Sequence, residues 1–178
     1  MKLYFVRHGQ TDANAKMTQG GQIAELDEPL NAAGVQQATE AADALKAIDF
    51  DAVVSSPLRR AVQTAEIINK YHNKNIQIDD AWRERQAGAY IDATVWHDLF
   101  DFDKNIPIEN GESLEDFFKR VQAAMIDLKS HFGPDSSILV VSHGGVQHVL
   151  YAYANKLPLA GNMRVSPMKN CEIREYEL

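Results

Sequence analysis

Two short, mostly apolar runs place the strongest constraint on how this chain folds. Residues 50–56 read FDAVVSS and residues 137–143 read SILVVSH. Runs of this kind are typical of strands that helices cover on both faces of a parallel sheet. A helix is expected after each run, opening at Pro57 in the first case and at Val146, beyond two glycines, in the second. The alternation of strand and helix predicts an α/β fold with a mainly parallel sheet.

Weaker signals elsewhere fit the same alternation. Strands are expected at residues 2–6 and 76–79, and the weak alternation of residues 171–177 suits an edge strand. Asn31 suits the N-cap of a helix whose apolar residues recur at helical spacing, and an amphipathic helix is expected over 113–132. We therefore expect three layers, with the sheet lying between helices on both of its faces.

Two segments lack clear periodicity. Residues 9–30 are polar and glycine-rich and are expected to form a long loop, which in a compact domain is usually functional or disordered. Residues 85–110 are expected to form a small irregular cap over the site. A length of 178 residues suits one domain, so we expect residues 1–178 to form a single domain that includes this cap.

The charge balance argues against some classes of partner. The net charge is −7, so the overall field would repel nucleic acid and anionic membranes, and an anionic substrate would need a locally positive site. No stretch approaches the roughly 18 apolar residues of a membrane span. Cys171 is the single cysteine, which excludes an internal disulfide and suits a reducing compartment. We expect a cytoplasmic protein without nucleic-acid or membrane partners, and its oligomeric state stays open.

Polar groups follow three of the expected strands where those strands end. Arg7 and His8 follow the first strand, and residues 55–60 follow the apolar part of FDAVVSS. His143 is the last residue of the run SILVVSH. In open parallel sheets, ligands bind beyond the carboxyl ends of the strands. Taken alone, Arg7 and His8 could form no more than a polar turn. The three segments together favour a phosphate-handling site at one rim of the sheet.

His8 has the chemistry of a nucleophile for phosphoryl groups. A lone histidine is more often a surface or core residue, but an imidazole near neutral pH can attack phosphorus and hold the group as a phosphohistidine. Arg7 offers a planar fork to phosphate oxygens. Gly9 leaves space for the backbone to approach a ligand closely.

Arg59 and Arg60 stand at the start of the helix that follows residues 50–56. The simplest interpretation is a solvated pair, but helix starts normally favour acids over bases. An anion bound nearby would explain the pair, because a helix N-terminus and a guanidinium both favour phosphate. Only one of the two arginines needs to face such an anion.

The segment SHGGVQH, residues 142–148, repeats the design of the first strand end. His143 is followed by two glycines, and its imidazole could hydrogen-bond a phosphoryl oxygen and offset developing charge. His143 and His148 lie five residues apart, off the spacing of three or four that would favour a shared metal ion. We therefore expect no metal and no cofactor. We interpret the remaining histidines, at positions 72, 97, 131 and 148, as surface residues.

A general acid is needed to protonate the leaving oxygen. The 25 acidic residues are too many for spacing alone to select one. Glu84 lies in WRERQAGAY, residues 82–90, an irregular segment shortly after the strand at 76–79. On its own, this glutamate would more simply form a surface ion pair with Arg83 or Arg85.

Together these segments resemble the signatures of the histidine phosphatase superfamily, the phosphoglycerate mutase-like group. VRHGQTDAN resembles its R-H-G-x-[ST]-x-x-N signature, and SSPLRRAVQTAE resembles its S-S-x-L-x-R-A-x-Q-T-A segment. WRERQAGAY is similar to its L-x-E-x-x-x-G segment, NGESLEDFFKR to its G-E-S helix start, and VVSHGG to its second histidine motif. The segments follow the family order from residue 3 to residue 145.

The resemblance implies a role for each matching residue. His8 would be the phosphorylated nucleophile, Glu84 the proton donor and then the base that activates water, and His143 a partner of the phosphoryl group. Arg60 is preferred over Arg59 because it directly precedes AVQTA. The phosphate-binding residues that the resemblance implies are Arg7, Thr11, Asn14, Gly21, Arg60 and Gly144.

These roles describe a metal-independent phosphomonoesterase acting on a small phosphorylated metabolite. A phosphoglycerate mutase is the second interpretation, but mutases of this group look longer, whereas 26 residues (85–110) separate Glu84 from the GES motif here. The resulting open site favours hydrolysis. A non-catalytic phosphate-binding module is the third interpretation, although His8 and Glu84 are both retained. Departures from the family pattern after Gly21 and after Glu84 leave the substrate open.

Overall fold

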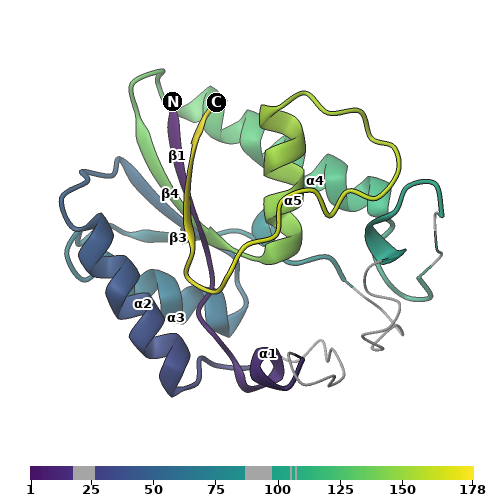
Figure 1. Cartoon of the computed structure of the whole chain (residues 1–178). Coiled ribbons are helices and arrows are strands. Elements are labelled where there is room, and N and C mark those ends of the chain that lie inside the picture. The colour runs from purple at the N-terminus through teal and green to yellow at the C-terminus, as the bar shows by residue number, and fades with distance from the viewer. Residues whose placement is uncertain (18–26, 87–97, 105, 107) are drawn as a thin grey trace.

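The computed structural model describes residues 1–17, 27–86, 98–104, 106 and 108–178. Its centre is a five-stranded sheet in the order β3-β2-β4-β1-β5 (Figure 1). The strands are β1 (Lys2–Arg7), β2 (Ala52–Ser55), β3 (Ile76–Ile78), β4 (Ser137–Ser142) and β5 (Ile173–Glu177). Four strands run parallel, and β5 pairs antiparallel with β1 at the edge. The predicted α/β fold with a mainly parallel sheet is confirmed.

Helices cover both faces of the sheet, as the continuous apolar runs predict. Helices α2 (Ala32–Leu45) and α3 (Arg59–Asn69) pack on the face that carries Tyr4 and Val6. Helices α4 (Leu114–His131) and α5 (Gly144–Ala154) pack on the other face. Leu3 and Phe5 of β1 belong to this second core, because alternate residues of a strand point to opposite faces. The expected three layers are thus present.

Two helices begin at a side-chain cap, and the first of these caps is the one expected from the sequence. The Asn31 side chain accepts a hydrogen bond from the Gly34 N–H at the start of α2. The Ser113 side chain accepts one from the Asp116 N–H at the start of α4. Each cap satisfies a backbone donor that the helix itself leaves without a partner.

Four expected boundaries are wrong or incomplete. Helix α3 begins at Arg59, with Leu58 as its N-cap, rather than at Pro57. The expected loop at 9–30 contains a short helix, α1 (Asp12–Met17). Helix α5 begins at Gly144 rather than at Val146, with His143 as its N-cap. The expected cap at 85–110 is described only in part; within it, a 3₁₀ helix η2 (Asp98–Phe100) buries Leu99 and Phe100 in the core.

Phe100 and Trp82 are both fully buried core residues. Trp82 ends a second short 3₁₀ helix, η1 (Asp80–Trp82), which follows β3. Tyr90 and Trp96 lie outside the described residues. Among the helices described, none combines the length and the apolar character that a bilayer crossing requires.

Candidate active site

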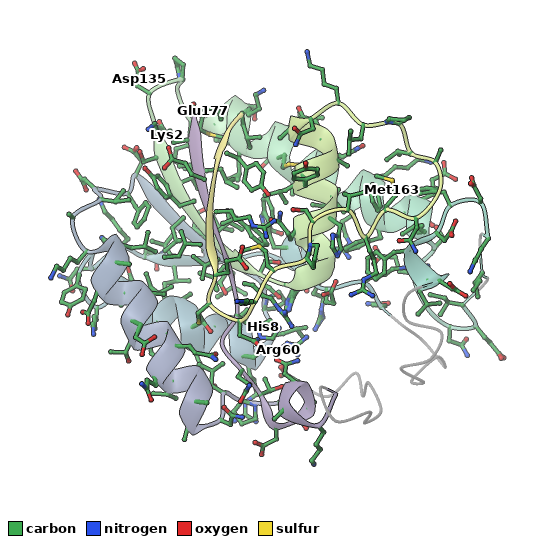
Figure 2. The ribbon with its side chains drawn as sticks, in the orientation of Figure 1. Lys2, His8, Arg60, Asp135, Met163 and Glu177 are labelled. Carbon is green, nitrogen blue, oxygen red and sulfur yellow. The ribbon has the colours of Figure 1, made fainter. Side chains whose placement is uncertain are left out.

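The carboxyl ends of β1, β2 and β4 bring the three polar segments to one rim of the sheet. Arg7 pairs in register with Ser142, and the His8 N–H donates to the Ser142 carbonyl at 2.9 Å. Arg60 comes from the first turn of α3, just beyond β2. Figure 2 shows His8 and Arg60 side by side where β1 ends. The segments that the sequence places at strand ends therefore meet in space.

The hydrogen bonds of His8 determine which ring nitrogen can act as a nucleophile. Its Nδ1 lies 2.8 Å from the Gly9 carbonyl oxygen, which can only accept, so Nδ1 carries the proton. Nε2 then holds the lone pair, and it accepts from Nε of Arg60 at 3.2 Å. Burial, followed by the nearby Arg60 and Arg7, lowers the pKa of His8 well below its usual 6.5. The ring is therefore neutral at physiological pH, with a nucleophilic Nε2.

Arg7 is anchored at one end of its guanidinium and lacks a partner at Nε. Its Nη1 donates to the Met168 carbonyl at 2.5 Å. Its Nε is buried without a hydrogen-bond partner among the described residues. A Cβ at Gly144 would lie 3.6 Å from this Nε, so Arg7 and the start of α5 are adjacent. A buried donor beside a helix N-terminus is suited to an anion.

His143 lies against His8, with ring centroids 5.1 Å apart and ring planes at 59°. Its Nε2 is 2.7 Å from the Ser56 hydroxyl oxygen. Its Nδ1 is buried and has no partner among the described residues. Burial and the nearby Arg60 lower the pKa of His143 well below 6.5, so this ring is also neutral. A neutral imidazole with one unpaired nitrogen can serve as a hydrogen-bond partner for a phosphoryl group.

Glu84 is bound to the start of α5 and forms neither of the ion pairs considered from the sequence. Its two carboxylate oxygens accept from the backbone N–H groups of Arg85 and Gly145, each at 2.9 Å. Arg83 pairs with Asp80 instead. The half-buried carboxylate lies close enough to Arg7 and Arg60 to raise the pKa of both guanidiniums, against the larger lowering by burial. Glu84 therefore shares the site with these cations.

Gly145 is required by this placement of Glu84. A Cβ at position 145 would lie 2.0 Å from Oε1 of Glu84 and 3.0 Å from Cζ of Phe100. Separations below about 3 Å are closer than van der Waals contact allows. The second glycine of SHGG thus makes room for the carboxylate.

The GES motif and Arg120 hold the segment that carries Glu84. Nε and Nη2 of Arg120 each donate to a carboxylate oxygen of Glu112 at 2.7 Å. Nη1 donates to the backbone carbonyls of Ala81 and Arg83, at 2.9 and 3.2 Å. Arg120 therefore links α4 to the backbone on either side of Trp82, immediately before Glu84.

Thr11 and Asn14 form a reciprocal cap at the start of α1 beside His8. The Thr11 N–H donates to Oδ1 of Asn14 at 3.3 Å, and the Asn14 N–H donates to the Thr11 hydroxyl at 3.2 Å. Nδ2 of Asn170 donates to the same Asn14 oxygen at 3.1 Å and to the His8 carbonyl at 3.0 Å. Both predicted residues are thus placed close to His8. Gly21 lies outside the described residues.

Gly9 has a use that the sequence does not indicate. The close approach of a ligand stays a prediction, and the group that approaches Gly9 within the fold is the backbone of α2. A Cβ at Gly9 would lie 2.6 Å from the Gly34 carbonyl oxygen. The absence of a side chain at position 9 therefore lets the end of β1 pack against α2.

Arg59 and Arg60 separate as the sequence predicts. Arg59 is exposed, and its backbone N–H donates to Asp27 at 2.6 Å. Arg60 is half-buried and turns to His8. Asp27 therefore satisfies one backbone N–H at the start of α3. The sequence does not indicate this partner.

His148 corrects another expectation, because it is buried rather than on the surface. It is 4 % exposed, and its Nδ1 accepts from the Ser166 N–H at 3.3 Å. Burial lowers its pKa to about 4. In the part of the chain that the structure describes, no group of three or more His, Cys, Asp or Glu side chains is arranged to hold a metal ion.

The sequence does not indicate three contacts of the site, which are made by Ser56, Met168 and Asn170. Ser56 lies inside a recognised segment, but no local pattern indicates that it reaches His143. Asn170 contacts the His8 carbonyl across 162 positions of sequence. Contacts of this kind depend on the sheet order, which the strand signals alone do not define.

Proteins of known name are similar to this chain over most of its length. The "uncharacterized phosphatase PhoE" of Bacillus subtilis (strain 168) is 36% identical over 82% of this chain and 72% of that protein. The "probable phosphoglycerate mutase GpmB" of Proteus mirabilis (strain HI4320) is 32% identical over 99% of this chain and 85% of that protein.

A solved structure extends the similarity to the fold. The mycobacterial glucosyl-3-phosphoglycerate phosphatase, in a complex with VO3, superposes with a TM-score of 0.82 at 28% identity. The match covers 98% of this chain and 91% of that one. Residues 3–178 also match the family model of the histidine phosphatase superfamily (branch 1). The chain therefore belongs to the histidine phosphatase superfamily.

Proposed function

We propose that this protein is a phosphatase that hydrolyses small phosphomonoesters through a phosphohistidine on His8. The single observation that carries the proposal is the bonding of the His8 ring. The Nδ1–H bond to the Gly9 carbonyl leaves the Nε2 lone pair beside Arg60. A neutral, oriented imidazole next to a guanidinium can attack a phosphoryl group that the same guanidinium binds.

The first step forms a bond between Nε2 of His8 and phosphorus while the ester P–O bond breaks. For this, the Arg60 Nε–H must move its hydrogen bond from Nε2 to the phosphoryl group. Negative charge on the phosphoryl oxygens would be offset by Arg7 and Arg60, and the start of α5 adds the positive end of its dipole. In the proposed cycle Glu84 starts as the neutral carboxyl, one of its oxygens accepting from the Gly145 N–H, and the leaving alkoxide takes its proton.

The second step returns the enzyme to its starting state. Glu84, now a carboxylate, accepts a proton from water as the water oxygen attacks phosphorus. The P–N bond breaks, inorganic phosphate forms, and the electron pair returns to Nε2 of His8. Because these steps use the side chains alone, the proposal needs no metal ion.

The test is the hydrolysis of an aryl phosphate by the parent protein and by His8→Ala. We expect turnover by the parent to survive EDTA and to fall at least 1,000-fold in the variant, roughly the scale of losing a covalent nucleophile. His131→Ala is the matched control, because this exposed histidine at the end of α4 is remote from the rim. Full activity in His8→Ala would contradict the proposal, and loss in EDTA would contradict its metal-independent part.

Trapping the intermediate separates an enzyme from a non-catalytic phosphate-binding module. Brief reaction with a ³²P-labelled phosphoester followed by quenching in alkali should leave acid-labile label on the parent but not on His8→Ala. A folded parent protein that binds phosphate yet never acquires label from any phosphoester would favour the binding module.

Phosphoglycerate mutase chemistry is the second candidate, because the relative from Proteus mirabilis carries that name. A mutase returns the phosphoryl group to an acceptor alcohol, whereas a phosphatase passes it to water. A coupled assay with 3-phosphoglycerate and a bisphosphoglycerate primer distinguishes them. We expect release of inorganic phosphate to exceed formation of 2-phosphoglycerate.

We further infer that residues 1–178 form one domain, with 85–110 as its cap. Both apolar clusters pack on the same sheet, which supports this organisation. The proposed substrate is a small phosphorylated metabolite. A cytoplasmic location is part of the same proposal and rests on the lone Cys171, which precludes an internal disulfide.

A further inference from the structure

Two adjacent serines at the end of β2 differ in a way that bears on His143. Ser55 and Ser56 are both 0% exposed. The Ser55 hydroxyl donates to the Ser56 carbonyl at 2.9 Å and so serves the local backbone. The Ser56 hydroxyl oxygen instead lies 2.7 Å from Nε2 of His143. One serine of the pair therefore contacts the site, and the other does not.

The direction of the Ser56–His143 hydrogen bond follows from the buried hydroxyl hydrogen of Ser56, which needs an acceptor. The Ser56 oxygen accepts from the Leu58 N–H at 3.3 Å. Among the described residues, Nε2 of His143 is the atom within hydrogen-bond distance that can accept the hydroxyl hydrogen. A hydroxyl that accepts one bond and donates another forms a polarised chain, which strengthens both bonds. The chain runs from Leu58 N–H through Ser56 O–H to His143.

This direction determines where the ring proton of His143 lies. A neutral imidazole has one N–H and one bare nitrogen. If Nε2 accepts from Ser56, the proton is on Nδ1. Nδ1 is the buried atom without a partner among the described residues, and a buried unpaired donor costs about 1–3 kcal/mol. A phosphoryl oxygen in the site would provide the missing acceptor.

We propose that Ser56 is a positioning residue that holds His143 as its Nδ1–H tautomer, so that this N–H donates to a phosphoryl oxygen of the substrate. The inference rests on the proposed phosphatase function. The opposite tautomer would present a lone pair to an oxygen that is itself negative. Ser56 therefore sets whether His143 stabilises or opposes phosphoryl transfer.

The experiment reads the tautomer directly. In protein labelled with ¹⁵N-histidine, protonated and bare ring nitrogens differ in chemical shift, and the His143 signals are identified by their loss in His143→Asn. We expect the parent to show Nδ1–H and a bare Nε2. Ser56→Ala should lose this preference and show a mixture of tautomers, whereas Ser55→Ala should retain the parent pattern.

Kinetics test the functional consequence in the same variants. We expect kcat for an aryl phosphate to fall about 10- to 100-fold in Ser56→Ala, somewhat less than the loss of a whole oxyanion donor. Inhibition by vanadate, which resembles the five-coordinate transition state, should weaken in parallel. Ser56→Thr keeps the hydroxyl and should restore the tautomer and most of kcat, while Ser55→Ala should keep the parent kcat.

The spectrum of the parent protein tests the inference even if a variant fails to fold. A proton on Nε2 of His143 in the parent would overturn the inference, as would an unchanged tautomer and kcat in folded Ser56→Ala. If the parent hydrolyses no phosphoester, the phosphatase proposal fails, while the tautomer measurement still reports on the Ser56 bond. The two failures are therefore distinguishable.

Discussion

Gly145 gives the most local prediction, because a side chain there would compete with Glu84 for space. The added Cβ of Gly145→Ala would lie 2.0 Å from Oε1 of Glu84. The carboxylate can swing away, so we expect the fold to survive while kcat falls roughly 10- to 100-fold, as is typical when a catalytic group shifts by about 1 Å. Steady-state kinetics and urea unfolding measure the two effects.

Gly133→Ala is the matched control for this substitution. The nearest atom to a Cβ at Gly133 is the Ser136 hydroxyl oxygen at 4.0 Å, an ordinary contact. Both kcat and the free energy of unfolding should stay close to the parent values. A Gly145→Ala protein with the parent kcat would show that the position of Glu84 is not critical.

His8 leads to a prediction about the pH dependence of kcat/KM. Its folded pKa is lowered well below 6.5, first by burial and then by Arg60 and Arg7. The reactive form is the neutral imidazole, so it persists as the pH falls through 6.5 and is lost only at more acidic pH. After correction for ionisation of the substrate, kcat/KM for an aryl phosphate should show no acid limb near pH 6.5. A limb at that pH would contradict the neutral, buried nucleophile.

At the scale of single residues, the sequence predicts the residues of the candidate site better than the residues that hold them in place. Arg7, Arg60 and His143 could be selected because each stands beside a strand end, and such ends share one rim in a parallel sheet. The structure brings them around His8, while their chemical roles remain predictions. Ser56 and Asn170 could not be selected, because their contribution depends on which atom each contacts in the folded chain.

Among the elements, α4 makes the most consequential contact through Arg120. Arg120→Ala would remove the Glu112 ion pair and the bonds to the Ala81 and Arg83 carbonyls. We expect about 1–3 kcal/mol of lost stability, because the pair is only partly exposed. We also expect a larger fall in kcat for alkyl than for aryl phosphates, since alkoxides depend more on protonation by Glu84.

Lys119→Ala provides the comparison for Arg120→Ala. Lys119 is the neighbouring residue of α4, and its pair with Glu115 is exposed, with both side chains 66% accessible. Such pairs contribute little to stability, about 0.3–0.5 kcal/mol on a helix. The ratio of alkyl to aryl turnover should match that of the parent. An equal ratio in Arg120→Ala would show that Arg120 does not position Glu84.

Elements with strong periodicity were predictable, and short or glycine-rich ones were not. The helix over 113–132 has a long amphipathic pattern with a Ser113 cap, and it appears as Leu114–His131. Helix α1 has six residues, too few to show a period against the polar background of 9–30. The sequence suggests that the two glycines only lead into α5, yet the helix begins at Gly144, and Glu84 occupies the space that a side chain at Gly145 would need.

For the molecule as a whole, three buried histidines predict lower stability in mild acid. His8, His143 and His148 each have a lowered folded pKa, to about 4 for His148, mainly through burial. Below the unfolded value of about 6.5, the unfolded chain binds protons that the folded protein excludes. The free energy of unfolding should therefore fall as the pH drops from 6.5 toward 5, by at most about 1.4 kcal/mol per pH unit for each histidine.

His148→Gln tests this dependence, because glutamine does not titrate and its amide oxygen can still accept from the Ser166 N–H. Between pH 7 and 5, the free energy of unfolding measured in urea should depend less on pH in His148→Gln than in the parent. The difference should correspond to at most one bound proton. His131→Gln, at an exposed position, is the control. An undiminished dependence in His148→Gln would mean that His148 is not held neutral by burial.

The pairing of the first strand has a consequence for how the site is assembled during synthesis. β1 lies between β4 and β5, and the Cys171 N–H donates to the Arg7 carbonyl at 2.9 Å. A ribosome therefore releases His8 more than a hundred residues before β4 and the segment around Cys171. Until those segments emerge, His8 has neither its neighbouring strands nor its buried surroundings. The candidate site can thus become complete only long after its first strand has been made.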